Sequence, residues 1–138
     1  MPFVLDCSVA MAWGFPDEAS EATGRWRDSL IDDRASVPSL WPVEVGSGLL
    51  TAARRGRVDA DEWPRICASL EALLVEVEAV SLSRVWRSAL ALADRYDLSV
   101  YDATYLELAL HMRLPLATLD RARAAAPKTA GVDTPAAL

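Results

Sequence analysis

The stretch Phe3-Val4-Leu5-Asp6 decides the fold, because three consecutive apolar residues are followed at once by an acid. A short run that is apolar throughout is typical of a strand buried on both faces, as in a parallel sheet. Further short strands are predicted along the chain, the last of them weak. They cover residues 35–37, 75–77 (with Val80 as an extension), 114–119 and 131–134.

Helical segments alternate with these strands. Ser8 is expected to cap a short helix through Ala12, and Asp17 to open a second one over 18–30. Apolar residues at helical spacing predict further helices at about 42–55 (ended by Gly56), 61–73 (capped by Asp59 or Asp61), 85–96 and 100–112, with a small alanine-rich helix after Asp120. This alternation indicates βαβ crossovers, and therefore an α/β protein whose parallel sheet is covered on both faces.

Length and composition indicate one domain over residues 1–138, since 52% of the residues are hydrophobic and 25% are charged. No apolar run approaches the roughly 18 residues of a membrane span, and no basic stretch precedes the first apolar residues. We therefore expect a soluble, cytoplasmic protein without membrane contact. Cys7 and Cys67 match no metal-binding spacing, and His111 is the single histidine. Catalysis, if present, must come mainly from carboxylates.

Four acids are expected at the same edge of the sheet. Asp6 and Asp120 end predicted strands, whereas Glu44 and Asp102 lie near the starts of helices. In open parallel sheets, ligands bind beyond the carboxyl ends of the strands, where all four side chains would meet. Each acid also has a purely structural interpretation: a helix cap for Asp120, a capping box with Ser99 for Asp102, and a favourable helix-dipole position for Glu44.

Clustered carboxylates repel one another unless a cation compensates them. Oxygen ligands without histidine favour Mg²⁺ or Mn²⁺ over zinc, some of the acids acting through water. Such a centre can activate a water against a phosphodiester bond. Ser8 and Thr118 lie two residues from Asp6 and Asp120. Their hydroxyls would either orient a carboxylate or a water, or cap a helix.

The positive charge is carried almost entirely by arginine, in a chain of net charge −6. Two clusters stand out, Arg25 with Arg27, and Arg54 with Arg55 and Arg57. They are either solvated helix ends or contacts for a nucleic-acid phosphate backbone. Gly46 and Gly48 lie inside a predicted helix, where each costs about 1 kcal/mol relative to alanine. We expect another backbone to approach closely there, at a dimer contact for example.

Four segments together resemble the PIN-domain family, and more narrowly the VapC toxins of bacterial type II toxin–antitoxin modules. They are residues 4–10 (VLDCSVA), 41–45 (WPVEV), 98–109 (LSVYDATYLELA) and 114–120 (LPLATLD). The resemblance implies a three-layer α/β/α sandwich with a short, mostly parallel sheet of four or five strands. It also implies a metal-dependent ribonuclease with Asp6, Glu44, Asp102 and Asp120 as the acidic quartet, supported by Ser8 and Thr118.

The same resemblance implies an RNA substrate, a small antitoxin whose C-terminal segment covers the acidic cleft, and a homodimer. Two other functions stay open. Asp6 could be the nucleophile of a phosphoryl-transfer enzyme, although the second aspartate that haloacid-dehalogenase phosphatases carry two positions on is Ser8 here. The chain could also be a non-catalytic PIN-like binding module.

Overall fold

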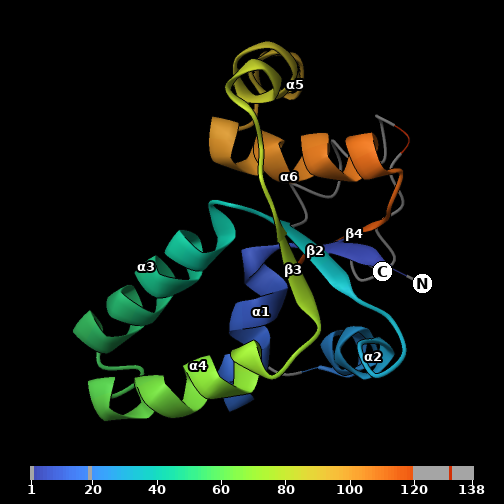
Figure 1. The fold of residues 1–138 in the computed structure, drawn as a ribbon. Coiled ribbons are helices and arrows are strands. Elements are labelled where there is room, and N and C mark those ends of the chain that lie inside the picture. The colour runs from blue at the N-terminus through green and yellow to red at the C-terminus, as the bar shows by residue number, and fades with distance from the viewer. Residues whose placement is uncertain (1, 19, 120–130, 132–138) are drawn as a thin grey trace.

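A computed structural model describes residues 2–18, 20–119 and 131 (Figure 1). At its centre, four parallel strands form one sheet in the order β3-β2-β1-β4. The strands are β1 (Phe3–Leu5), β2 (Ala35–Pro38), β3 (Val75–Glu78) and β4 (Leu116–Ala117). The predicted α/β class is confirmed, and β4 is shorter than the predicted 114–119. Residues 132–134 of the predicted fifth strand and the alanine-rich helix after Asp120 lie outside the described residues.

Helices cover both faces of the sheet and complete three layers (Figure 1). One side carries the π-helical segment η3 (Arg84–Ala89), α5 (Leu90–Tyr96) and α6 (Val100–Met112). The other carries α1 (Cys7–Gly14), η1 (Pro16–Glu18), α2 (Glu21–Ser29), η2 (Ala60–Glu62) and α4 (Trp63–Glu71), with α3 (Trp41–Arg54) packed against α1. Within the described part of the chain, no helix is both long and apolar enough to cross a bilayer.

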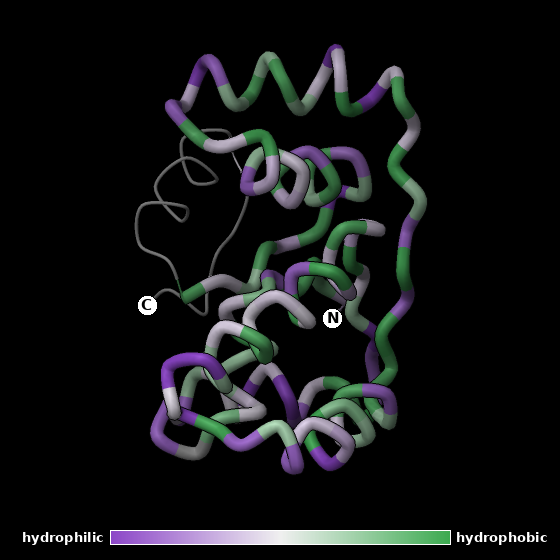
Figure 2. Tube along the Cα trace, turned by 90° about the vertical axis from the view of Figure 1, so that its left-hand side faces the viewer, coloured by the Kyte–Doolittle hydropathy of each residue, from purple (hydrophilic) through white to green (hydrophobic). Residues whose placement is uncertain are grey.

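The centre of the sheet is its most buried part. Phe3, Val4 and Leu5 of β1 are fully buried between β2 and β4, as the apolar run predicts. At the sheet edge, β3 alternates hydrophobic and hydrophilic residues along its length (Figure 2). The burial of β3 does not follow this alternation, because Glu76 and Val77 are both exposed while Val75 and Glu78 are partly buried. The carboxyl end of β1 therefore lies in the interior of the sheet, which is where Asp6 follows it.

Several helix ends differ from prediction for identifiable local reasons. Helix α1 begins directly after Asp6, so Ser8 lies inside the helix and does not cap it. Helix α2 begins after Ser20, whose hydroxyl accepts a hydrogen bond from the Thr23 N–H in a reciprocal capping box. Asp17 falls instead in the short 3₁₀ turn η1. Gly56 ends the α3 region as predicted, with a φ of 72° that glycine tolerates without a Cβ clash.

A buried ion pair joins the α5–α6 layer. Arg84 donates through Nε and Nη2 to the two carboxylate oxygens of Glu107, at 2.9 and 2.8 Å. The Glu107 side chain is 6% exposed and that of Arg84 is 23% exposed. The predicted regular helix over 85–96 thus begins with a π-helical segment that carries Arg84, and the ion pair holds this segment against α6.

Candidate active site

Asp6 is the most buried of the three site acids that the structure describes, with only 1% of its surface exposed. It occupies the N-cap position of α1, but its side chain caps nothing. Two hydroxyls donate to the same carboxylate oxygen: Ser8 to Oδ2 at 2.7 Å and Thr118 to Oδ2 at 2.8 Å. The backbone N–H of Leu119 in turn donates to the Ser8 hydroxyl at 3.0 Å. Both hydroxyls therefore contact the Asp6 carboxylate, and Ser8 lies inside α1 and does not cap it.

Glu44 lies in the first turn of α3, as predicted, and is partly exposed. The hydroxyl of Tyr105, from α6, donates to its Oε1 at 2.6 Å. Burial, followed by the hydrogen bond and the negative charge of Glu44, raises the pKa of Tyr105 well above its usual range, and Asp6 raises that pKa further. Ser8, whose hydroxyl donates to Asp6, lines the same cavity as Glu44, so the two acids lie on the same side of the fold. Tyr105 remains a protonated donor to Glu44.

Asp102 and Asp120 are placed less completely. Asp102 lies in the first turn of α6, and its backbone N–H donates to the Ser99 hydroxyl at 3.0 Å, as the predicted cap requires. It precedes Tyr105 by three residues, so both project from the same side of the helix. Asp120 lies outside the described residues. Across the described ranges there is no group of three or more His, Cys, Asp or Glu side chains able to hold a metal ion.

Two adjoining cavities open beside the acid pair. The first, of about 280 Å³, is lined by Cys7, Ser8, Glu44 and Ser47. The second, of about 300 Å³, shares Ser47 and continues along α3 to Arg55 and Arg57. Gly48 lies between α1 and α3, where a Cβ would come within 2.9 Å of the Met11 side chain. Among the described residues of this chain, a side chain and not a backbone approaches Gly48, and nothing lies within 4 Å of a Cβ on Gly46. The expected dimer contact at these glycines stays a prediction.

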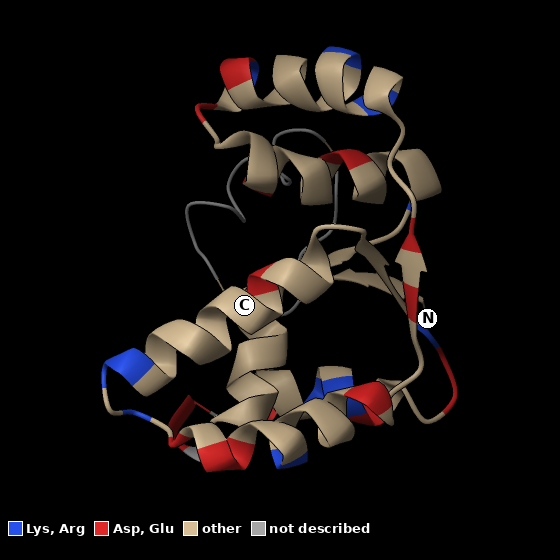
Figure 3. Cartoon of the chain, turned by 60° about the vertical axis from the view of Figure 1, so that its left-hand side comes forward, with Lys and Arg blue, Asp and Glu red and all other residues tan. Residues whose placement is uncertain are grey.

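The predicted arginine clusters differ in their surroundings. Arg57 forms ion pairs with Asp17 at 3.2 Å and Glu18 at 3.5 Å, and its guanidinium lies 5.0 Å from the centre of the Phe15 ring. Arg54 and Arg55 are exposed at the end of α3, whereas Arg25 and Arg27 are exposed on α2. Figure 3 shows the resulting polarity of α3, with an acid near the sheet and basic residues at the far end.

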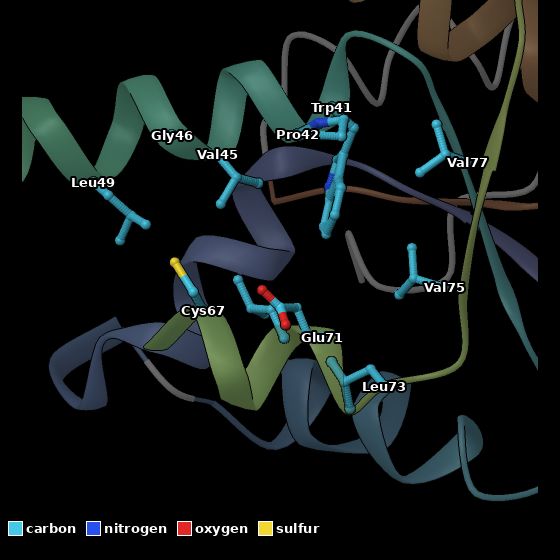
Figure 4. A pocket seen from close by; sticks show the side chains of 11 residues that line it. Trp41, Pro42, Val45, Gly46, Leu49, Cys67, Glu71, Leu73, Val75 and Val77 are labelled. Atoms are coloured by element: carbon cyan, nitrogen blue, oxygen red, sulfur yellow. The ribbon is translucent and has the colours of Figure 1, made fainter. Parts of the chain in front are cut away.

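A separate apolar groove of about 420 Å³ lies between α3, α4 and β3 (Figure 4). Trp41, Val45 and Leu49 of α3 line one wall. Glu44 and Ser47 line a different cavity. Of the described residues that line the groove, Glu71 is the one acid. The groove therefore takes no part in the arrangement around Asp6.

Tyr105 is the site residue that the sequence reasoning missed. Helical spacing places it on the packing face of α6 together with Leu108 and Ala109. The signal that could have found it is chemical, because a buried tyrosine hydroxyl nearly always has a hydrogen-bond partner. Tyr105 follows Asp102, a suspected site acid, by three residues. The partner of its hydroxyl could therefore have been sought among the other acids.

The fold is an α/β domain with a parallel sheet, and its candidate site lies where Asp6 follows the carboxyl end of β1. The family model described as PIN domain matches residues 3–128. The chain belongs to the PIN-domain family.

Individual relatives agree with this assignment. The chain is 32% identical over 121 residues to "Ribonuclease VapC3" of Pyrobaculum aerophilum, covering 88% of this chain and 91% of that protein. It is 33% identical over 119 residues to "Ribonuclease VapC9" of Mycobacterium tuberculosis, covering 85% and 84%. Among solved structures, PAE2754 from Pyrobaculum aerophilum matches with a TM-score of 0.68 and 26% identity, covering 91% of this chain and 84% of that one.

Proposed function

We propose that this protein is a Mg²⁺- or Mn²⁺-dependent endoribonuclease and the toxin of a toxin–antitoxin pair. One observation carries the proposal: Ser8, which donates to Asp6, and Glu44 line one cavity, although the sequence keeps the two acids far apart. The chain is also similar over most of its length to proteins named ribonucleases. Asp6, Glu44, Asp102 and Asp120 are the proposed catalytic acids, with Ser8 and Thr118 in support.

The donor set at Asp6 and Glu44 fits a hard divalent cation. Carboxylate oxygens are the ligands that Mg²⁺ and Mn²⁺ prefer, and His111 is exposed near the end of α6. Three hydroxyl donors keep the two carboxylates oriented, those of Ser8 and Thr118 on Asp6 and that of Tyr105 on Glu44. Metal ligands are generally oriented by hydrogen bonds from neighbouring groups, as these two carboxylates are. Asp6, Glu44 and Asp102, with Asp120, would hold the ion.

When bound, the ion supplies a water of lowered pKa and offsets the charge that develops on the phosphodiester. The protein's own contribution is positional. Ser8 and Thr118 fix one oxygen of Asp6, so the other oxygen has a defined direction. Tyr105 stays protonated at working pH, because burial and Glu44 raise its pKa, and it therefore acts as a donor and not as a base.

The phosphoryl-transfer alternative is weaker on this geometry. A carboxylate that attacks phosphorus must be reached by the substrate, but Asp6 is 1% exposed and one of its oxygens already accepts two hydroxyl protons. A non-catalytic module would keep the same hydroxyl donors, because a buried carboxylate needs hydrogen-bond partners in any protein, but it would cut no RNA. Both alternatives remain outcomes of the experiment below.

The activity is tested with Asp6→Asn and with Asp94→Asn, which alters an exposed acid on α5. Labelled single-stranded RNA is incubated with each purified protein in Mn²⁺, in Mg²⁺ and in EDTA. We expect Asp6→Asn to lower the cleavage rate by about 100-fold or more, an effect of about 3 kcal/mol. Asp94→Asn should cut at the wild-type rate, and EDTA should stop all cleavage. Cleavage by Asp6→Asn at the wild-type rate would overturn the proposal.

The proposed partners are tested separately. Expression with the neighbouring small reading frame should yield a complex in which RNA cleavage is suppressed, and sedimentation should give the mass of a homodimer for this chain alone. A free monomer that no neighbouring product inhibits would contradict these two parts of the proposal.

A further inference from the structure

We infer that single-stranded RNA lies along the α1–α3 groove, the two adjoining cavities that share Ser47, and runs from the acid pair to Arg55. The inference rests on the proposed ribonuclease function and specifies how the substrate is held. It begins from a continuity in the structure. The cavity beside Glu44 and the cavity that reaches Arg55 have Ser47 in common, so the two form one path along the surface.

The α3 wall of this groove has a regular pattern. Glu44, Ser47, Thr51 and Arg55 follow one another at spacings of three and four residues, which places them on one face of the helix. From Glu44 to Arg55 the helix rises about 16 Å. An acid at the proposed cleavage point is thus followed by two exposed hydroxyls and then by a guanidinium.

This order of groups suits a nucleic-acid backbone. Serine and threonine hydroxyls and arginine are common donors to phosphate and sugar oxygens, and these contacts fix the register of a strand without reading its sequence. Ser47, Thr51 and Arg55 are each about one helical turn apart, so they can contact successive positions of an extended strand. The apolar groove behind Trp41 offers no comparable row of donors.

The two arginines of the groove have different roles. The charge of Arg57 is offset by Asp17 and Glu18, and its guanidinium is held over Phe15. Among the described residues, no ion pair is formed by Arg55, which is exposed. In a molecule of net charge −6, Arg55 is therefore the local cation that can attract a phosphate toward the open end of the groove.

Two small residues, Gly48 and Ala52, line the groove between α1 and α3. A Cβ on Gly48 would lie 2.9 Å from the Met11 side chain, so a larger residue would force the two helices or the methionine to move. With glycine here and Ala52 one turn further on, α1 and α3 pack closely, and the hydroxyls of Ser47 and Thr51 stand at the margin of the groove.

The test measures RNA binding in the Asp6→Asn protein, so that the substrate is not cut. Fluorescence anisotropy with a labelled single-stranded RNA is recorded over a range of KCl concentrations. Arg55→Ala is compared with Arg87→Ala, which removes an equally exposed arginine from the opposite layer. We expect Arg55→Ala to weaken binding about tenfold at low salt and to reduce the slope of log K against log salt by about 0.7. Arg87→Ala should change neither.

A second pair of variants blocks the middle of the groove. Thr51→Glu places a negative charge at an exposed helical position, and Ala91→Glu does the same on α5. In the cleaving protein, Thr51→Glu and Arg55→Ala should raise KM for RNA with kcat unchanged, because they act on substrate binding away from the acids. Ala91→Glu should leave both constants as they are.

The outcomes separate this inference from the function on which it rests. If the wild type cuts RNA but Arg55→Ala and Thr51→Glu bind it as their controls do, the groove is wrong and the function stands. If the wild type neither cuts nor binds RNA, the function itself is wrong. If Arg55→Ala weakens binding of a polyglutamate peptide and not of RNA, the groove holds a protein segment, and the inference is overturned.

Discussion

Tyr105→Phe isolates one hydrogen bond of the candidate site. The substitution removes the hydroxyl that donates to Glu44 at 2.6 Å and leaves the buried ring in place. Tyr105 is 2% exposed, so water has little room to replace the lost donor. The expected effect is a Glu44 carboxylate that is less well oriented, in a protein whose packing is otherwise preserved.

The magnitude follows from the chemistry of this contact. A hydrogen bond to a charged group contributes about 1.5–3 kcal/mol. If that energy serves to hold Glu44 in its metal-binding orientation, its loss weakens the binding of Mn²⁺ by roughly 10- to 150-fold. Losing a hydrogen-bond partner of a metal ligand generally costs 10- to 100-fold, about the same range.

The assay is calorimetric titration of each protein with Mn²⁺. Tyr101→Phe is the matched control, because it makes the same chemical change on the same helix at a residue that is 66% exposed. Tyr101→Phe should bind Mn²⁺ like the wild type, and Tyr105→Phe should need a higher Mn²⁺ concentration for half-maximal RNA cleavage. Equal Mn²⁺ affinity in wild type and Tyr105→Phe, with both folded by circular dichroism, would refute the role of Tyr105.

Three further predictions concern stability. Because the pKa of Tyr105 is raised in the folded protein, the unfolded chain releases this proton first, so stability is lost as pH rises above the ordinary tyrosine pKa of about 10. Urea unfolding between pH 9 and 11 measures how the free energy of unfolding falls with pH. Above pH 10 this fall should be smaller in Tyr105→Phe than in the wild type by about 1.4 kcal/mol per pH unit, and an equal fall in both proteins would contradict the prediction. Arg84→Met should lower the free energy of unfolding by about 3 kcal/mol by leaving Glu107 buried without its cation, whereas Arg84→Met with Glu107→Leu should recover most of it. Ser20→Ala should cost about 1 kcal/mol in thermal unfolding, but Ser83→Ala, at an N-cap without a side-chain bond, should cost nothing measurable.

The elements that were predicted well are those whose signal is local. The apolar run of β1 and the helical spacing in α3 and α6 each specify burial within a few residues, and the observed elements follow them. The less accurate predictions involve competition between neighbouring signals. Asp17 and Ser20 both suit a helix start, and the capping box with Thr23 decides between them. Among the described strands, β4 pairs with β1 only, and this pairing over two residues sets its length, whereas its sequence suggested a longer run.

The candidate site was predictable to the level of the sheet edge. A parallel sheet places residues after strands and at helix starts together. In the structure Ser8, which donates to Asp6, lines one cavity with Glu44. The rule for parallel sheets cannot say which hydroxyl contacts which acid. Thr118 follows β4 but donates to Asp6, because β4 pairs directly with β1. Tyr105 contacts Glu44 through the packing of α6, which depends on the whole core.

The hydrogen bond from Thr118 to Asp6 spans 112 positions of the chain, and the Leu119 N–H adds a second link from the same late segment to Ser8. During synthesis, β1 and Asp6 leave the ribosome long before Thr118 and Leu119 have been added to the chain. A nascent chain that ends before β4 therefore carries Asp6 without the Thr118 hydroxyl, and carries Ser8 without the Leu119 N–H. The orientation of the first acid in the chain is completed only after the last described strand has been made.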